Sequence, residues 1–462
     1  MASRGNFNSK FGFIAAAAGT AVGLGNIWRF PFEVANGGGA AFLLVYLAFC
    51  FIFCLPIMLT EIAVGRNTQK DASGAFGHLG FPKWRFLGKM GILSSTIALS
   101  FYITIAAWSL GYVIEMLVGN FSIGTQFNTY VADIWLIGTY GIVFMVVTAI
   151  IVSKGIAGGI EKASKLLMPI LLVMIVLLSI YTLTLEHAIK GVSFYLIPDF
   201  SKLNFSVVYG AISQAFFSLS IGLSIYVTFG SYISKDDNLL SSAALITLSD
   251  VVVAFLSGFM LFPIVAYISG GLMDNVSGGP GLIFETLPGV FASIGNLWGS
   301  IIGVIFFLLL TFAALTSAIG LLEVPVTYLI DTHKMPRRKA VIVMCILIFV
   351  LGIPSMLGNG YSSFFTNFIH YGSDTQATNF LTFLMHSLDI LLISGGILIS
   401  VFAIHVWKDD KLAAEISSGF PAYNTAFIRK VLRILIGYVC PVVLSVVLLF
   451  TILDRYFGIT II

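Results

Sequence analysis

The chain has 462 residues, of which 58% are hydrophobic and only 10% are charged, and its mean hydropathy is +1.01. Soluble domains carry roughly 25% charged residues, so these numbers exclude a soluble fold for most of the chain. The net charge of +3 identifies no partner. We expect the chain to lie in a lipid bilayer and to bind no nucleic acid.

Eleven apolar runs are each long enough to cross a bilayer, which takes about 20 residues, and backbone in hydrocarbon must form helices to satisfy its own hydrogen bonds. In chain order these spans 1 to 11 cover residues 11–34, 40–66, 88–118, 134–153, 160–184, 206–233, 240–268, 298–331, 338–356, 381–407 and 429–454. The expected fold is therefore an all-α integral membrane protein with eleven transmembrane helices, forming one domain over residues 1–462.

The basic residues predict the orientation, because Lys and Arg collect on the cytoplasmic side of a membrane. A cytoplasmic N-terminus puts all but four of the 24 Lys and Arg residues on the inner side or at its border. The exceptions are Arg29, Lys190, Lys202 and Arg455. An odd number of spans then leaves the C-terminus outside, and we expect a multi-pass protein of the plasma membrane.

Two spans are interrupted at mid-membrane depth by residues that disfavour a helix. Span 1 contains AVGLGNIWRFP (21–31) and span 6 contains QAFFSLSIGLSIY (214–226). Breaks five spans apart indicate two inverted five-helix repeats, about 11–184 and 206–407, with an extra helix at 429–454 and a binding site where the breaks meet. Glycine also serves helix packing in membranes, but that alternative explains a single break better than two matched ones.

An unwound helix frees main-chain carbonyls and amides and exposes half-helix ends of opposite partial charge. Carbonyl oxygens suit a hard cation, and amide N–H groups at a helix N-terminus suit a carboxylate. The break in span 1 therefore favours a zwitterionic amino acid with sodium beside it.

Six ordered motifs resemble those of the neurotransmitter:sodium symporter family, and of its bacterial amino-acid transporters in particular. They are GTAVGLGNIWRFPF, NGGGAAFLLVYL, EIAVGR, QAFFSLSIG, GPGLIFETLP and ALTSAIGLLEVPVTYLID, and the likeness runs from residue 4 to about residue 454. The resemblance implies a leucine-transporter-type fold and a prokaryotic symporter that imports an α-amino acid by alternating access, driven by two sodium ions. It implies no enzyme activity.

The resemblance implies that the first sodium is bound by the Ala21 carbonyl, the Asn26 side chain and Ser218, together with the substrate carboxylate. A carboxylate shared in this way would couple the two ligands, since each would raise the affinity of the other. The family's further ligand is an Asn in span 7, where this chain has Ser249 followed by Asp250. Either the Ser249 hydroxyl binds the ion or the site is built around Asp250.

The second sodium, again by resemblance, is bound by carbonyl and hydroxyl oxygens of spans 1 and 8. The residues are Gly19, Val22, Ala313, Thr316 and Ser317, and all five match the pattern of the family.

The substrate pocket implied by the resemblance is apolar. Monoamine transporters have an Asp at the position of Gly23, so Gly23 leaves room for a substrate with its own carboxylate, which Tyr102 would hydrogen-bond. The other expected pocket residues are Ala21, Leu24, Gly25, Ala98, Phe217, Ser218, Ser220, Leu223, Ser317 and Leu321. An acidic or basic substrate side chain would be buried unpaired there, at a cost of several kcal/mol. We expect a bulky hydrophobic or aromatic amino acid.

Charged residues within apolar spans are functional candidates by default. By resemblance, Arg29 is half of an outer gate, with Asp389 in span 10 as its expected acidic partner, and Arg4 and Asp331 form an inner gate. Glu61 resembles a structural acid that accepts hydrogen bonds from the unwound part of span 6.

Chloride-dependent members of the family bind the anion with side chains that Tyr46, Gln214 and Ser218 match here. The span 7 serine of that site is Val253 in this chain. We expect Asp250 to replace the chloride, as a fixed charge or as a proton carrier on the return step, so chloride is not required.

Three other functions stay open at this point. In a proton-coupled amino-acid transporter of similar architecture, Thr316 and Ser317 would hold no ion and a residue such as Asp250 would carry the proton. An amino-acid sensor would bind the same ligand without moving it. A membrane enzyme is disfavoured, because no histidines pair at ligand spacing.

Overall fold

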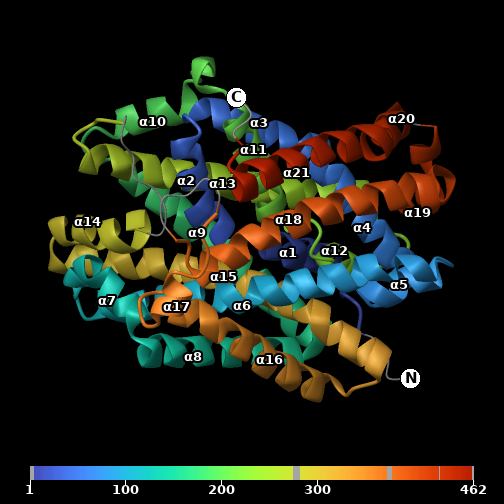
Figure 1. Cartoon of the computed structure of the whole chain (residues 1–462), viewed down its shortest axis with the longest axis horizontal. Helices are drawn as coiled ribbons and strands as arrows, with labels where there is room; N and C mark the ends of the chain where they lie inside the picture. The colour runs from blue at the N-terminus through green and yellow to red at the C-terminus, as the bar shows by residue number, and fades with distance from the viewer. Residues whose placement is uncertain (1–4, 274–280, 372–376, 426, 460–462) are drawn as a thin grey trace.

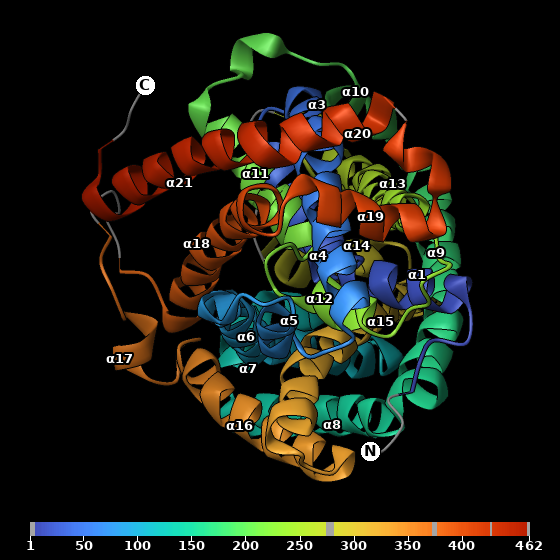
Figure 2. The ribbon, with the colours of Figure 1, turned by 90° about the vertical axis from the view of Figure 1, so that its right-hand side faces the viewer.

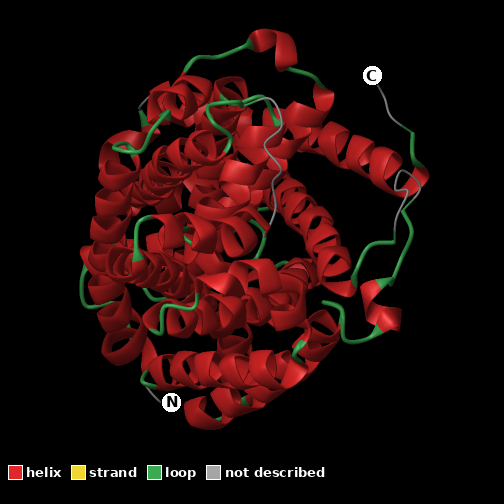
Figure 3. Cartoon of the chain, turned by 90° about the vertical axis from the view of Figure 1, so that its left-hand side faces the viewer, coloured by secondary structure: helices red, strands yellow, loops and turns green. Residues whose placement is uncertain are grey.

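The computed structural model describes residues 5–273, 281–371, 377–425 and 427–459, and this part of the chain consists of helices joined by loops (Figure 3). Its one sheet-like feature within those ranges is an isolated bridge between Ile369 and Thr378. The expectation of an all-α membrane protein is confirmed.

Ten segments of the described residues are long and apolar enough to cross a membrane, when one bent pair is taken as one span. The bent pair is span 1, in which α1 (Lys10–Ala21) and the segment Gly25–Asn36, comprising η1 (Gly25–Arg29) and α2 (Phe30–Asn36), meet at 49°. The nine others are Ala40–Thr68 (α3, η2 and α4), Pro82–Leu117 (η3 and α6), Ile134–Ser153 (α8), Ile156–Thr182 (η5 and α9), Leu239–Ile268 (α13), Asn296–His333 (α15), Arg337–Leu357 (α16), Phe380–Val406 (α18 and η8) and Phe427–Leu453 (α20, η10 and part of α21). Span 6 consists of the shorter α11 (Phe205–Ser218) and α12 (Ile225–Gly230), which completes the eleven predicted spans.

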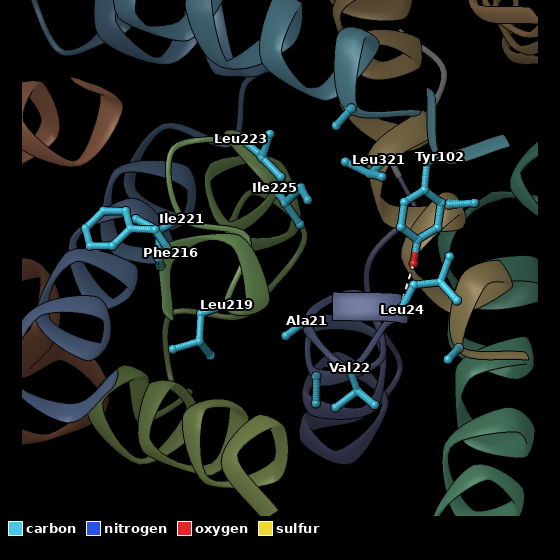
Figure 4. Close-up of a cluster of buried hydrophobic side chains, with 14 of the residues drawn as sticks. Ala21, Val22, Leu24, Tyr102, Phe216, Leu219, Ile221, Leu223, Ile225 and Leu321 are labelled. Atoms are coloured by element: carbon cyan, nitrogen blue, oxygen red, sulfur yellow. Dashed lines mark hydrogen bonds between the residues drawn. The ribbon is translucent and has the colours of Figure 1, made fainter. Parts of the chain in front are cut away.

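Both predicted breaks are present. In span 1, α1 ends at Ala21 because Val22 leaves the helical region, with φ −70° and ψ 94°. In span 6, Ser220, Gly222 and Ser224 all have positive φ, which is costly for the two serines and therefore stores strain in this segment. Figure 4 shows the broken parts of the two spans facing each other, with Ala21 on one side and Leu219 on the other.

The broken spans lie inside the bundle, and the most lipid-exposed helices lie around it. Seen along the long axis, α4 (Leu55–Thr68) and α12 lie near the centre, while α8, α9 (Lys162–Thr182), α16 and α21 (Cys440–Phe457) lie at the periphery (Figure 2). Burial follows this arrangement, since 83% of the apolar window of α6 (Arg85–Leu117) is buried but only 28% of that of α8. A site between the breaks is thereby shielded from lipid.

Short helices occupy the connections between spans and separate to the two ends of the bundle. In Figure 1, α5 (Ala72–His78) and α19 (Asp409–Gly419) lie at the right-hand end, and α7 (Phe127–Ala132) and α14 (Leu287–Ser293) lie at the left-hand end. Two further connecting helices are α10 (Ala188–Leu196) and α17 (Ser363–Thr366). Helices α5 and α19 follow spans 2 and 10, whereas α7 and α14 follow spans 3 and 7. Connections after even-numbered and odd-numbered spans thus lie at opposite ends, as successive membrane crossings require.

Candidate substrate and ion site

A small cavity of about 30 Å³ lies between the two breaks. It is lined by Thr20, Ala21, Gly23, Gly25, Ala98, Phe101, Tyr102, Phe217, Ser218, Ser220, Leu223, Ser317, Leu321 and Leu388. No charged side chain is among them. Every expected pocket residue lines this cavity except Leu24, whose main-chain N–H instead donates to the Tyr102 hydroxyl at 3.0 Å (Figure 4).

Three lining residues were missed from the sequence: Thr20, Phe101 and Leu388. Thr20 lies in the GTAVGLGN motif and Phe101 precedes Tyr102, so proximity to expected residues was the available signal. Leu388 lies in span 10, directly before the acid Asp389. Only the packing of span 10 against the cavity identifies it.

Two glycines allow the chain to approach the cavity closely. A Cβ atom on Gly23 would lie 2.3 Å from the Ser317 Oγ and 2.9 Å from the Tyr102 hydroxyl oxygen. On Gly25 it would lie 3.0 Å from the Phe217 ring. Neither position accommodates a side chain without displacing its neighbours, so this chain has no space for a carboxylate at position 23.

Asp250 forms the centre of the first oxygen cluster, and its side chain is fully buried. It accepts hydrogen bonds from Asn26 Nδ2 at 2.7 Å, from the Ser218 hydroxyl at 2.9 Å and from the Tyr46 hydroxyl at 3.2 Å. These contacts join spans 1, 2, 6 and 7 at the break of span 1. A buried carboxylate is costly unless donors or a cation compensate its charge, and this cluster supplies three donors.

Ser249 does not reach this cluster, and the alternative in which its hydroxyl binds the ion is corrected here. The hydroxyl donates to the carbonyl of Leu245 on the same helix at 2.7 Å, on a partly exposed face. Successive residues of a helix point about 100° apart, so α13 can turn only one of Ser249 and Asp250 towards span 1. That residue is Asp250.

Gln214 lies near this cluster but contacts the break itself. Its Nε2 donates to the carbonyl of Gly25 at 3.0 Å. Asn26 contacts the break in the same way, since its Oδ1 accepts from the Gly23 N–H at 3.1 Å. Two side-chain amides therefore satisfy main-chain groups that the unwinding of span 1 exposes.

The second oxygen cluster lies between spans 1 and 8. The Thr316 Oγ1 lies 3.5 Å from the carbonyl oxygen of Val22 and 3.0 Å from that of Ala313. Gly19 packs against the same threonine, because a Cβ atom there would lie 3.4 Å from the Thr316 Cβ. Four of the five residues expected at the second sodium site are thus neighbours.

Ser317, the fifth residue, donates its hydroxyl to the Thr20 carbonyl at 3.0 Å and also lines the cavity between the two breaks. It therefore lies between the second cluster and the cavity. The carbonyl and hydroxyl oxygens of this cluster are ligands for a hard cation such as sodium. Among the described residues, no group of three or more His, Cys, Asp and Glu is placed to hold a metal ion.

Arg29 and Asp389 form a two-pronged ion pair above the cavity. Arg29 Nη1 lies 3.1 Å from Asp389 Oδ1, and Nη2 lies 3.1 Å from Oδ2. Both side chains are buried, and the guanidinium lies 4.6 Å from the centroid of the Phe217 ring, which lines the cavity. The pair thus lies next to the cavity, behind the ring of Phe217.

The expected inner pair falls partly outside the described residues, since Arg4 is not among them. Asp331 lines a wide cavity of about 1230 Å³ at the α5 end of the bundle. Its Oδ2 accepts a hydrogen bond from the Asp71 N–H at 2.9 Å.

Glu61 is buried in span 2, and its Oε1 accepts a hydrogen bond from the Gly222 N–H at 3.1 Å. Gly222 has φ +83°, so this contact stabilises the left-handed backbone of the span 6 break.

A profile of the sodium:neurotransmitter symporter family matches residues 4–134 and 137–455. This chain belongs to that family. It is therefore a membrane transporter and not an enzyme.

Relatives and a solved structure agree with this assignment. A sodium-dependent transporter of Haemophilus influenzae is 35% identical over an alignment of 375 positions, which covers 77% of this chain and 80% of that protein. The sodium-dependent transporter YhdH of Bacillus subtilis is 34% identical over 91% of this chain and 92% of its own length. The crystal structure of MhsT in complex with L-phenylalanine is similar with a TM-score of 0.87 and 37% identity, over 97% of this chain and 99% of that one.

Proposed function

We propose that this symporter family member couples the inward movement of two sodium ions to the import of an α-amino acid with a bulky apolar or aromatic side chain. The observation that carries the proposal is an uncharged cavity lying between two oxygen clusters at the break of span 1. The similarity to MhsT, which was solved with L-phenylalanine, supports the substrate class.

The polar end of the cavity fits an amino-acid carboxylate. The Tyr102 oxygen accepts a hydrogen bond from the Leu24 N–H, which leaves its own proton to donate to the substrate. The close packing at Gly23 supports a substrate that brings its own carboxylate, because the chain cannot supply one there. The apolar walls then select the side chain, since a charged group would be desolvated without a partner.

The two clusters would bind the ions. In the first, the Ala21 carbonyl, Asn26, Ser218 and the Asp250 carboxylate surround sodium together with the substrate carboxylate. In the second, carbonyl and hydroxyl oxygens around Thr316 bind the other ion. A carboxylate shared between substrate and sodium raises the affinity of each for the other, which is the coupling that symport requires.

The position of Asp250 also supports transport that does not require chloride, because its fixed negative charge lies beside Tyr46 and Ser218, where chloride would otherwise bind. The same buried carboxylate supports a second candidate function, a proton-coupled transporter in which Asp250 carries the proton. The two functions differ in whether the Thr316 cluster binds an ion.

Alternating access would proceed by opening the Arg29–Asp389 pair on the outer face of the plasma membrane and by releasing ligands through the wide cavity at Asp331 on the cytoplasmic face. A cytoplasmic N-terminus is supported by the basic side chains that line this cavity together with Gly5, which are Lys70, Arg85, Lys154, Lys334 and Arg337.

The proposal is tested by binding of radiolabelled phenylalanine, tryptophan and leucine to purified protein in sodium and in potassium. We expect binding only in sodium, and we expect Thr316→Ala to weaken it at least tenfold by removing a ligand of the second ion. The matched control is Thr311→Ala on the same helix, whose hydroxyl donates only to its own helix at Phe307. Binding that is indifferent to sodium and to Thr316→Ala would favour the proton-coupled candidate.

A further inference from the structure

Arg29 has a second carboxylate partner that the family resemblance does not assign. The Glu33 Oε1 lies 3.5 Å from Arg29 Nε, one helical turn further along α2. The Glu33 side chain is 22% exposed, whereas that of Asp389 is only 3% exposed. The guanidinium therefore lies between a buried acid and an acid nearer to solvent.

The two acids differ in whether they lie on the same helix as Arg29 and so move with it. Glu33 lies on the same helix, so it moves with Arg29 whenever the outer half of span 1 moves. Asp389 lies on α18, 360 residues away in the chain. Any movement that separates span 1 from span 10 breaks the Asp389 contact and leaves the Glu33 contact intact.

The surroundings hold Glu33 close to Arg29. A Cβ atom on Gly210 of α11 would lie 3.3 Å from the Glu33 Oε2, so the carboxylate lies against span 6. The Ser213 hydroxyl, one turn further along α11, accepts from Arg29 Nη2 at 2.9 Å. Arg29 Nη2 thus contacts both Ser213 and Asp389, while its Nε faces Glu33.

We propose that Glu33 is a gating residue that keeps Arg29 paired while the Arg29–Asp389 contact opens, and so speeds the opening of the outer gate. This inference rests on the proposed transport function. A buried arginine that loses its only carboxylate is strongly destabilised, and this penalty would oppose opening. A second carboxylate that travels with the arginine reduces the penalty, because the open gate still contains an ion pair.

The test measures opening directly. Ala98 lines the cavity beneath the gate, so a cysteine introduced as Ala98→Cys can react with a membrane-impermeant thiol reagent from outside only when the gate is open. The reaction rate is measured in right-side-out vesicles without sodium or amino acid, and compared with that of the chain lacking the new cysteine.

In the Ala98→Cys background, Glu33→Gln is expected to slow the reaction about fivefold, the effect of one partly exposed ion pair. Glu33→Asp keeps the charge and is expected to react at nearly the parent rate, which separates loss of charge from misfolding. Asp389→Asn is expected to speed the reaction, because it weakens only the closed gate. Glu186→Gln, an exposed acid in a connecting loop, is the matched control and is expected to change nothing.

The inference is overturned if Glu33→Gln reacts as fast as the parent or faster, since Glu33 would then be a bystander or a clamp on the closed gate. Sodium-dependent binding of phenylalanine is scored separately in the chain without the reporter cysteine. Its absence would overturn the proposed function and leave the comparison of gate opening intact.

Discussion

Asp250 and Ser249 are neighbours on α13, yet only the carboxylate meets Asn26 and Ser218. The sequence placed both residues near the proposed first sodium site and left the choice between them open. The rotation of the helix decides that choice, and packing against spans 1, 2 and 6 sets the rotation. Sequence motifs predicted the residue types of this site, whereas its geometry depends on contacts between distant segments.

Asp250→Asn is expected to raise the sodium concentration needed for half-maximal amino-acid binding by tenfold or more, because charge-assisted contacts contribute about 1.5–3 kcal/mol. Ser249→Ala, one residue away, is expected to leave it unchanged. The measurement is binding of labelled phenylalanine across a sodium titration. Equal effects of the two substitutions would contradict the placement of Asp250.

Gly23→Ala is expected to abolish measurable amino-acid binding, since the new methyl group would overlap the Ser317 hydroxyl and crowd that of Tyr102. Gly138→Ala is the control, because a Cβ atom there has no neighbour within 4 Å. Saturation binding at fixed sodium gives the comparison, with size-exclusion chromatography to show that both variants are folded. Undiminished binding by Gly23→Ala would show that the substrate does not use this part of the cavity.

At the scale of elements, helix breaks are easier to predict than the attachments of connecting helices. The breaks in spans 1 and 6 follow from glycine, serine and proline within apolar runs, which are local signals. Helix α19 is attached through Arg66 of the EIAVGR motif, which is fully buried and pairs with Glu415, 349 residues away. A single sequence contains no signal for a pair at that separation.

The Glu415 cluster provides a test of this attachment. Burial tends to raise the pKa of Glu415, but hydrogen bonds from Lys235, Asn67 and Arg66 outweigh it and hold the pKa below its ordinary value of 4.5. The folded chain therefore binds this proton less tightly than the unfolded chain. The ionised Glu415 therefore stabilises the folded chain fully at pH values above the pKa that Glu415 has in the unfolded chain. This stabilisation is lost as the pH falls through the lower pKa that Glu415 has in the folded chain.

Glu415→Gln is expected to destabilise the protein at pH 7 by about 3–5 kcal/mol, because it leaves Arg66 buried without its carboxylate. It should also reduce the loss of stability between pH 7 and pH 3. Thermal unfolding in detergent at both pH values measures these effects, with the exposed Glu186→Gln as control. An unchanged melting temperature at pH 7 would mean that α19 is not held by this pair.

At the scale of the whole molecule, hydropathy alone predicted all eleven spans and, with the matched breaks, the architecture. It could not predict whether the Arg29–Asp389 pair is formed. In this structure the pair is formed next to the cavity, while the wide cavity at Asp331 lies at the end that carries α5 and α19. The lipid-facing helices α8, α9 and α16 enclose these features and account for the exposed apolar surface.

We propose that a sodium gradient drives amino-acid import through this molecule. The most direct measurement is uptake of labelled phenylalanine into proteoliposomes with sodium outside and potassium inside, at equal pH across the membrane. Phenylalanine is expected to accumulate inside above its external concentration, and this accumulation is expected to collapse when a sodium ionophore removes the gradient. Accumulation that persists without sodium and follows an imposed proton gradient would contradict the proposal and show that protons drive the transport.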